Sequence, residues 1–272
     1  MTPHWLAIER REAPLILSIP HAGVDLLHYG QRYESDWLAR RDADWHLPEL
    51  YDFAAGLGAT ILRTCLSRSI IDVNRDPSGA SLYPGQATTG LCPTTTFDGE
   101  PLYREGQAPG PEEIAERRRA YFAPYHEALA GEIARLRARH PRVALYDAHS
   151  IRSRIPRLFD GELPLFNLGT NDGRACSPAL RGRLGGILAE SGQSHVVDGR
   201  FKGGWITRAY GRPQEGVEAV QMELGCRAYM EEPEPIGPDN WPTPLDPRRA
   251  APTRATLKSV LQAMLIFVGE TP

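Results

Sequence analysis

The sequence contains little cysteine, and its cysteines are far apart. Only four occur in 272 residues, and no two of them form a C-x-x-C pair. They are Cys65, Cys92, Cys176 and Cys226. This usage favours reduced thiols in a cytoplasmic enzyme over a disulfide framework.

Long apolar runs and an excess of one charge are also absent. No apolar stretch approaches the ~18 residues of a membrane span, and residues 2–9 lack the pattern of a signal peptide. The 31 basic and 34 acidic residues give a formal net charge of −3, so no global field points to nucleic acid or to a membrane surface. We therefore expect a cytoplasmic protein that binds neither nucleic acid nor membranes.

Several common catalytic motifs are missing. The sequence has no G-x-S-x-G, G-x-G-x-x-G or P-loop pattern. A cysteine nucleophile needs a histidine partner, and the sequence does not place one beside any of the four cysteines. Metal-assisted chemistry is the hypothesis that the remaining residues support.

Short apolar segments alternate with segments of helical periodicity along the chain. This alternation predicts a three-layer α/β/α sandwich with a central, mainly parallel but mixed sheet, in one α/β domain of residues 1–272. The expected strands are residues 15–19, 59–63, 69–73, 143–146, 166–169, 195–198 and 218–224. The expected helices are residues 35–57, 111–139 with a bend at Pro124, 178–191 and 254–268.

Residues 76–111 lack any periodic pattern and are rich in glycine, proline, serine and threonine. A structureless segment of this length inside a compact domain is usually a functional loop or a disordered linker. Its aromatic and apolar side chains, among them Tyr83, Leu91 and Phe97, indicate that it packs against the domain. We therefore expect a lid-like loop rather than a linker.

Two of the expected strands each lead into a histidine. His21 follows residues 15–19, and His149 follows residues 143–146. Ligands of open α/β sheets bind outside the carboxyl ends of the strands, so the two imidazoles can meet there. Together they predict a metal site that still needs a carboxylate and a water. A structural role for each histidine taken singly is the alternative.

Aspartates near both histidines can complete such a site. Catalytic zinc commonly takes three protein ligands from His, Asp and Glu and keeps a fourth position for water. Asp42 and Asp44 follow the first histidine in the chain, and either can supply the carboxylate. Asp147 precedes His149 by two residues and can orient its ring or bond to the backbone.

Glu223 is the candidate for the general base. It lies in the expected strand 218–224, where burial would raise its pKa toward the range useful for proton transfer. Gln221 shares its face of the strand, whereas the alternate residues are apolar, and this pattern predicts a polar cleft. The alternative is an edge-strand glutamate that faces solvent.

Several cationic or amide side chains fall in turns near the expected strand ends. They are Arg68, Asn74, Arg75, Arg152, Arg154, Arg200, Lys202 and Arg208. A guanidinium group binds a carboxylate through two hydrogen bonds, so their convergence would indicate a small-molecule substrate with one or more carboxylates. Each of them taken alone is more typical of a solvated surface.

Short segments across residues 15–230 together resemble the N-formylglutamate amidohydrolase family, the deformylases of histidine breakdown. The segments are 18–23 (SIPHAG), 42–46 (DADWH), 67–75 (SRSIIDVNR), 81–86 (SLYPGQ), 89–93 (TGLCP), 147–152 (DAHSIR), 158–161 (LFDG), 167–171 (NLGTN), 199–204 (GRFKGG) and 221–224 (QMEL). The resemblance implies a fold like that of the zinc exopeptidases and the phosphorylase/hydrolase group. It also implies zinc-dependent hydrolysis of N-formyl-L-glutamate to formate and L-glutamate.

The resemblance also implies roles for individual residues. The metal ligands would be His21, Asp44 and His149, and the catalytic base would be Glu223. Asp42 and Asp147 remain alternative ligands or supporting residues. The residues implied to bind the two carboxylates of the substrate are Arg68, Asn74, Arg75 and Arg152.

One position departs from the family pattern. Where the family leads us to expect a histidine, in Gly-Val-His-Ala, this chain has Glu218. The departure bears on the acyl or amino-acid specificity. Two alternatives therefore stay open: a related zinc amidohydrolase that acts on another N-acyl amino acid or a peptide, and a non-catalytic protein that binds carboxylates.

Overall fold

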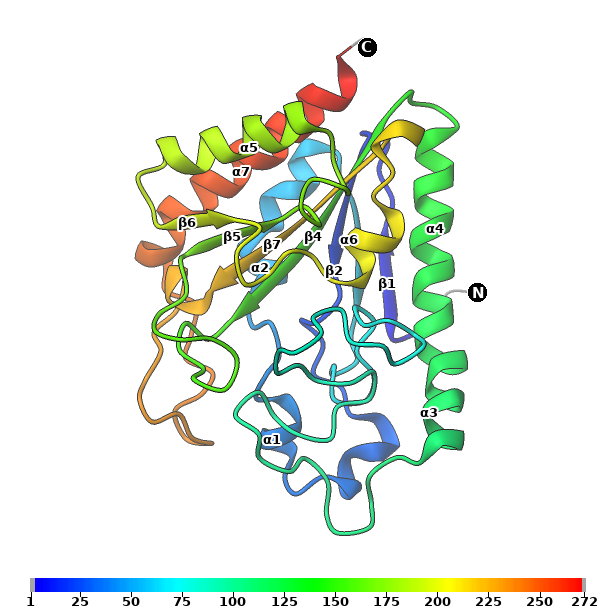
Figure 1. Cartoon of the computed structure of the whole chain (residues 1–272), viewed down its shortest axis with the longest axis vertical. Helices are drawn as coiled ribbons and strands as arrows, with labels where there is room; N and C mark the ends of the chain where they lie inside the picture. Colours follow the sequence, from blue (N-terminus) through cyan, green and yellow to red (C-terminus); the bar gives the residue numbers. More distant parts are fainter. Residues whose placement is uncertain (1–2, 271–272) are drawn as a thin grey trace.

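The fold is organised around a mixed sheet, seen in a computed structural model that describes residues 3–270 (Figure 1). Its strands are β1 (Leu6–Glu9), β2 (Leu15–Ile19), β3 (Thr60–Thr64), β4 (Val143–Ile151), β5 (Phe166–Gly169), β6 (His195–Val197) and β7 (Val217–Gly225). Their order in the sheet is β1-β3-β2-β4-β7-β5-β6. The four central strands β3, β2, β4 and β7 are parallel, whereas β1 and β5 pair in antiparallel fashion with β3 and β7.

Helices cover both faces of this sheet. The α-helices are α1 (Asp36–Arg40), α2 (Leu47–Leu50), α3 (Pro111–Arg117), α4 (Ala123–Arg137), α5 (Pro178–Glu190), α6 (Trp205–Tyr210) and α7 (Pro247–Gly269). Helices α5 and α7 pack together on one face, whereas α4 and α6 pack on the other (Figure 1). This arrangement confirms the predicted α/β/α sandwich with a mixed sheet. None of the helices in residues 3–270 combines the length and apolar character needed to cross a bilayer.

The pleat of the central strands decides which side chains face the site. In β4 and β7, Tyr146 and Met222 enter the core beneath α5 and α7, whereas Leu145 and Ala219 enter the core beneath α4 and α6. Side chains alternate along a strand, so the polar residues that continue the second series lie on the α4–α6 side. These residues are Asp147, His149, Gln221 and Glu223.

The expected helix over residues 35–57 is wrong as a continuous element. Helix α1 and helix α2 are separated by a turn, and a 3₁₀-helical segment, Asp52–Leu57, follows. In this turn the backbone N–H of Asp44 donates to the carbonyl oxygen of His21 at 2.9 Å, and His46 has a φ of 60°. The backbone N–H of Asp44 is thus bonded to a distant loop and does not continue a helix.

The expected strand over residues 69–73 is also wrong. Its apolar side chains are buried, as in a strand, but its backbone bonds to tertiary partners instead of a neighbouring strand. Arg117 donates to the carbonyl oxygen of Ile70 at 2.9 Å, and the N–H of Asp72 donates to the carbonyl oxygen of Leu91 at 2.7 Å. The segment is apolar because it is buried, and this apolar sequence resembles that of a strand although no neighbouring strand pairs with it.

Two predicted helices differ from the structure at their ends or joints. The helix predicted over residues 111–139 contains a π-helical turn, Arg118–Phe122, just before Pro124. Proline has no N–H to continue the α-helical ladder, which accounts for the change at this point. The last helix begins earlier than predicted, because the Asp246 side chain accepts hydrogen bonds from the first backbone N–H groups of α7.

Residues 76–110 contain no helix or strand, as the sequence predicted. They form the cyan-to-green loops at the lower end of the molecule in Figure 1. The segment packs against the rest of the chain, since Leu91, Phe97, Leu102 and Tyr103 are buried. Whether the segment acts as a lid stays a prediction.

His126 of α4 connects the long helix to the loop that carries several site residues. Its Nε2 donates to the carbonyl oxygen of Val73 at 2.8 Å, and its Nδ1 is 2.9 Å from the hydroxyl of Tyr210. Burial lowers the pKa of His126 to about 4 from its ordinary value of 6.5. The ring is therefore neutral in the folded protein at pH values where it is charged in the unfolded chain.

We expect the His126→Gln variant to lose part of the acid sensitivity of the fold. Between pH 6.5 and pH 4, the unfolded state binds a proton that the folded state does not, so stability falls as pH falls. This single group contributes up to about 1.4 kcal/mol per pH unit. Urea unfolding at pH 7.5, 6 and 5 measures the slope. Identical slopes in wild type and variant would contradict the assignment.

Candidate functional site

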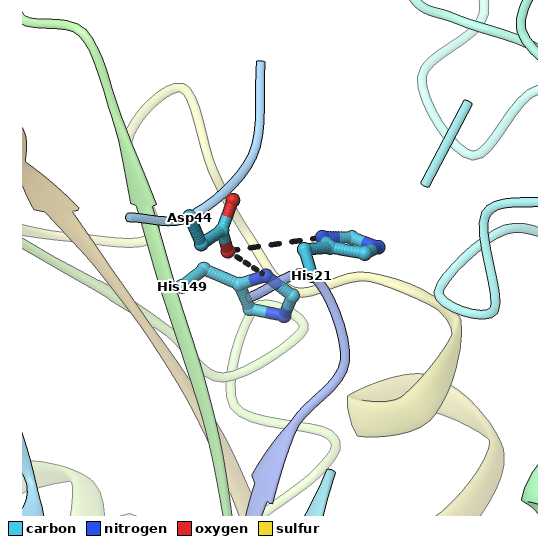
Figure 2. Close-up of side chains that lie close together, drawn as sticks. All are labelled: His21, Asp44 and His149. Atoms are coloured by element: carbon cyan, nitrogen blue, oxygen red, sulfur yellow. Dashed lines mark hydrogen bonds and ion pairs between the residues drawn. The ribbon is translucent and has the colours of Figure 1, made fainter. Parts of the chain in front are cut away.

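Three buried side chains from separate parts of the chain meet at the carboxyl ends of β2 and β4 (Figure 2). His21 follows β2, His149 lies in β4, and Asp44 lies in the turn between α1 and α2. Asp44 Oδ2 is 3.1 Å from His149 Nδ1 and 3.8 Å from His21 Nδ1. Ligands about 2.0–2.1 Å from a tetrahedral zinc ion lie roughly 3.4 Å apart. The observed spacing is therefore close to that of a metal site.

Each histidine ring is held from behind by an aspartate. His21 Nε2 is 2.7 Å from Asp72 Oδ1, and His149 Nε2 is 2.9 Å from Asp147 Oδ2. Both aspartates are fully buried. A carboxylate in this position fixes the tautomer and the orientation of the ring. As a result, the Nδ1 atoms of both rings face Asp44.

The residues present fit a divalent cation. His21 Nδ1 and Asp44 Oδ1 are buried and have no hydrogen-bond partner within residues 3–270. Burial alone would lower the pKa of His149, but Asp147 and Asp44 raise it well above its ordinary value, whereas burial and Arg68 lower the pKa of His21. A cation would take the place of the proton between His149 and Asp44. Two imidazoles and a carboxylate are also a donor set of catalytic zinc.

Glu223 lies beside this cluster on β7. Its Cα is in register with that of His149 on β4, and its Oε2 accepts a hydrogen bond from the Gln221 side chain at 3.1 Å. Burial and the carboxylates of Asp44 and Asp147 raise the pKa of Glu223 to about 7, against the opposing effect of His149 and Arg68. A carboxyl group with such a pKa can both accept and return a proton near neutral pH.

A pocket opens next to the cluster and is lined by His21, His149 and Glu223. Arg68 and Arg75 form part of its wall. Arg68 Nη2 is 2.7 Å from Asp72, and its guanidinium carbon lies 4.8 Å from the centre of the Phe97 ring. Arg75 donates to the carbonyl oxygen and to the hydroxyl of Thr89, each at 3.1 Å.

Asn74 connects the pocket wall to the cluster. Its Nδ2 donates to Asp147 Oδ2 at 3.0 Å, and its Oδ1 accepts from the backbone N–H of Ile206 at 2.7 Å. The side chain lies so close to the start of α6 that a Cβ atom at Gly204 would be only 2.4 Å from Asn74 Nδ2. Glycine at this position is therefore a packing requirement of the site.

Arg152 and Asp42 lie outside both the cluster and the pocket lining, as does Asp147, which supports His149 from behind. Arg152 forms an ion pair with Asp98 and lies 3.7 Å from Asp42, in a separate depression of the surface. Asp42 accepts a hydrogen bond from the backbone N–H of Phe97 at 2.6 Å. Both side chains hold the 76–110 segment in place. The structure thus brings Asp44, rather than Asp42, to the histidines.

Sequence reasoning missed some residues that contact the site. Asp72, the partner of His21, falls in the mispredicted strand 69–73, and it lies 51 positions further along the chain, so no local pattern indicates the contact. Tyr83 also lines the pocket, next to Arg200, which the sequence had already placed among the cationic turn residues. The GRFKGG segment and the loop composition were the signals for these positions.

Glu218, the departure from the family pattern, lies away from the pocket. It is buried near the start of β7, and its Oε2 accepts a hydrogen bond from the backbone N–H of Ser177 at 2.6 Å. Ser177 caps α5. The structure therefore gives this glutamate a contact with a helix end and none with the pocket walls.

Known proteins resemble this chain over most of its length. The sequence model described as N-formylglutamate amidohydrolase matches residues 13–230. The chain is 48% identical over 269 residues to an N-formylglutamate deformylase of Pseudomonas putida. It is 47% identical over 269 residues to one of Pseudomonas aeruginosa, and in both cases 97% of each chain is covered.

A solved structure supports the fold. The crystal structure of an N-formylglutamate amidohydrolase from Ralstonia eutropha has a TM-score of 0.78 with this chain, at 23% identity. The match covers 98% of this chain and 99% of that one. The family match over residues 13–230 and the identity of the two relatives carry the assignment. The chain belongs to the N-formylglutamate amidohydrolase family.

Proposed function

We propose that this chain is a zinc-dependent amidohydrolase that converts N-formyl-L-glutamate and water to formate and L-glutamate. The observation that carries the proposal is the buried cluster of His21, Asp44 and His149 beside Glu223, in which His21 Nδ1 and Asp44 Oδ1 make no hydrogen bond within residues 3–270. The names of the two relatives supply the substrate. The reaction would complete the histidine degradation route that the family resemblance implies.

The metal would be held by His21 Nδ1, His149 Nδ1 and the Asp44 carboxylate. When bound, it would polarise the formyl oxygen and lower the pKa of a bound water. Asp72 and Asp147 hold the two rings in the tautomer that leaves Nδ1 free for a ligand bond.

Glu223 is proposed to move the proton. Its carboxylate takes a proton from the water that attacks the formyl carbon, and a tetrahedral species forms. Glu223 then gives this proton to the amide nitrogen as the C–N bond breaks, so that the amine of glutamate leaves and formate remains. Burial of Glu223, which raises its pKa, suits a group that must hold and release a proton in each cycle.

Recognition must come mainly from the glutamate part of the substrate, because a formyl group offers little apolar surface. Arg75 is suited to bind a carboxylate, since within residues 3–270 its one ion pair is a long contact of 3.6 Å to Asp72, which leaves its charge poorly compensated. Arg68 is already paired with Asp72 and lies 3.6 Å from Asp44. We therefore assign Arg68 mainly to positioning and Arg75 mainly to binding.

The direct test is formate release by the purified protein. We expect formate from N-formyl-L-glutamate, loss of activity after treatment with a chelator, and recovery when zinc is added back. The physical reason is that His21 Nδ1 and Asp44 Oδ1 make no hydrogen bond within residues 3–270. N-acetyl- and N-formimino-L-glutamate serve as comparison substrates. Full activity after complete removal of metal, or a preference for another acyl group, would refute the proposal.

The Glu223→Gln variant should lose turnover and keep its metal. Loss of a general acid–base group typically lowers kcat by about 10²- to 10⁴-fold. Glutamine has nearly the same shape, so zinc content measured by atomic absorption should stay at the wild-type value. The matched control is Glu218→Gln on the same strand, which faces α5 and should keep near-wild-type kcat. A near-normal rate in Glu223→Gln would exclude it as the base.

The Arg75→Ala variant should bind substrate poorly and retain metal. Hydrogen bonds to charged groups are worth about 1.5–3 kcal/mol, so KM should rise roughly 10- to 100-fold. Steady-state kinetics and zinc analysis on the same preparation measure both effects. Arg154→Ala, which removes an exposed arginine paired with Glu162, is the control. Loss of zinc in parallel with the rise in KM would show that Arg75 supports the metal site instead.

A further inference from the structure

We propose that Arg200 binds the side-chain carboxylate of the substrate and so sets the preference for a dicarboxylate. This inference rests on the proposed function, because it names the part of N-formyl-L-glutamate that each region of the pocket recognises. Arg200 is absent from the set of carboxylate-binding residues that the family resemblance implies.

Arg200 is held in a fixed orientation at the pocket wall. Its Nε donates to the carbonyl oxygen of Leu158 at 2.9 Å, and its Nη2 donates to that of Ala87 at 3.0 Å. The rings of Tyr83 and Phe201 lie 5.3 and 5.2 Å from its guanidinium carbon. Its Nη1 makes no hydrogen bond within the described part of the chain. One edge of a preoriented guanidinium group is thus left for a ligand.

Arg200 differs from the other pocket arginines in its electrostatic partners. Arg68 and Arg75 both pair with Asp72. No carboxylate of residues 3–270 forms an ion pair with Arg200, whose two hydrogen bonds go to backbone carbonyl groups. Burial lowers its pKa, and the nearby charge of Arg75 contributes to this lowering, against the opposing effects of Tyr83 and Glu223. An incoming carboxylate would therefore relieve an uncompensated positive charge.

The position of Arg200 decides which carboxylate it meets. Asp72 holds His21 as well as Arg68 and Arg75, so these two arginines lie next to the ligand cluster. The hydrogen bonds of Arg200 go instead to loop residues, Leu158 and Ala87. In N-formyl-L-glutamate the α-carboxylate is attached to the carbon that bears the amide nitrogen, whereas the other lies two methylene groups further away. With the formyl group at the cluster, the α-carboxylate faces Arg75 and the distant one faces Arg200.

A purely structural role for Arg200 makes a different prediction. Its hydrogen bonds connect the 76–110 segment and the loop after β4 to its own loop. If Arg200 only held these loops together, its loss would lower kcat/KM equally for all substrates. If Arg200 recognises charge, its loss would lower kcat/KM only for substrates with a side-chain carboxylate. N-formyl-L-glutamine separates the two roles, because it has the same shape without the charge.

The experiment compares kcat/KM for both compounds in the zinc-supplemented protein. Wild type should prefer N-formyl-L-glutamate by about 10- to 100-fold. Arg200→Met should remove most of this preference through a rise in KM for N-formyl-L-glutamate, with the value for N-formyl-L-glutamine changed by less than about threefold. Arg200→Lys, which keeps the charge but not the planar fork, should restore part of the preference.

Tyr83→Phe is the matched control for loop integrity. It removes the hydroxyl that donates to the carbonyl oxygen of Gly203 at 2.9 Å and accepts from the N–H of Lys202 at 3.1 Å, and it keeps the charge of Arg200. Any loss of kcat/KM in this variant should be equal for N-formyl-L-glutamate and N-formyl-L-glutamine. The same equal loss in Arg200→Met would overturn the inference.

Binding measurements distinguish failure of this inference from failure of the proposed function. Calorimetry with the Glu223→Gln protein, with and without Arg200→Met, reports affinity for both compounds without turnover. If wild type releases no formate but Arg200→Met still abolishes the preference in binding, the activity is wrong and the inference holds. If wild type is active but the preference survives Arg200→Met, the inference is wrong and the activity holds. Absence of binding by both compounds also refutes the inference.

Discussion

The arrangement of the site depends on one buried carboxylate, that of Asp44, which faces two imidazole rings. Its side chain is fully buried. Its Oδ2 accepts from the backbone N–H of Ser150 at 3.2 Å, and its own N–H donates to the carbonyl oxygen of His21 at 2.9 Å. A buried charge is costly unless it is paired and hydrogen-bonded. The need to pair this carboxylate therefore holds together the turn after α1, the exit of β2 and the end of β4. A cation would bind the ligand atoms that make no hydrogen bond within residues 3–270.

The parts of the site that could be predicted from sequence are those that follow from strand geometry. His21 and His149 come from adjacent parallel strands, so their carboxyl ends lie side by side. The alternation in β7 puts Glu223 on the polar face, and the parallel register with β4 places it level with His149. These relations require only that the apolar segments be strands and that the strands be neighbours. The choice of Asp44 over Asp42 came from family resemblance, and the structure brings Asp44 to the histidines.

The mispredicted elements share a physical cause. Hydrogen bonds to residues distant in the chain determine their backbone conformation, and the local sequence pattern does not show these partners. Residues 69–73 are apolar enough for a strand, yet Arg117 and the 76–110 segment take their backbone bonds. Residues 35–57 have helical spacing, yet the chain turns where Asp44 reaches the first histidine. Arg152, which the family resemblance implies to bind the substrate, forms an ion pair with Asp98, more than fifty residues earlier in the chain. None of these partners is visible in the spacing of residues along the sequence.

The site therefore has two regions with different structural origins. The two histidines and Glu223 lie at the ends of sheet strands, and buried aspartates hold the histidine rings, so a change there disturbs buried charges. The outer wall is formed by loops, where Thr89 and the backbone near Ala87 hold the arginines through carbonyl and hydroxyl groups. Loop contacts of this kind can be altered without changing the strand ends. Under the proposed function, the sheet would therefore set the reaction type, and the loops would set the choice of amino-acid side chain. Glu218, the departure from the family pattern, belongs to neither region, because its side chain faces the start of α5.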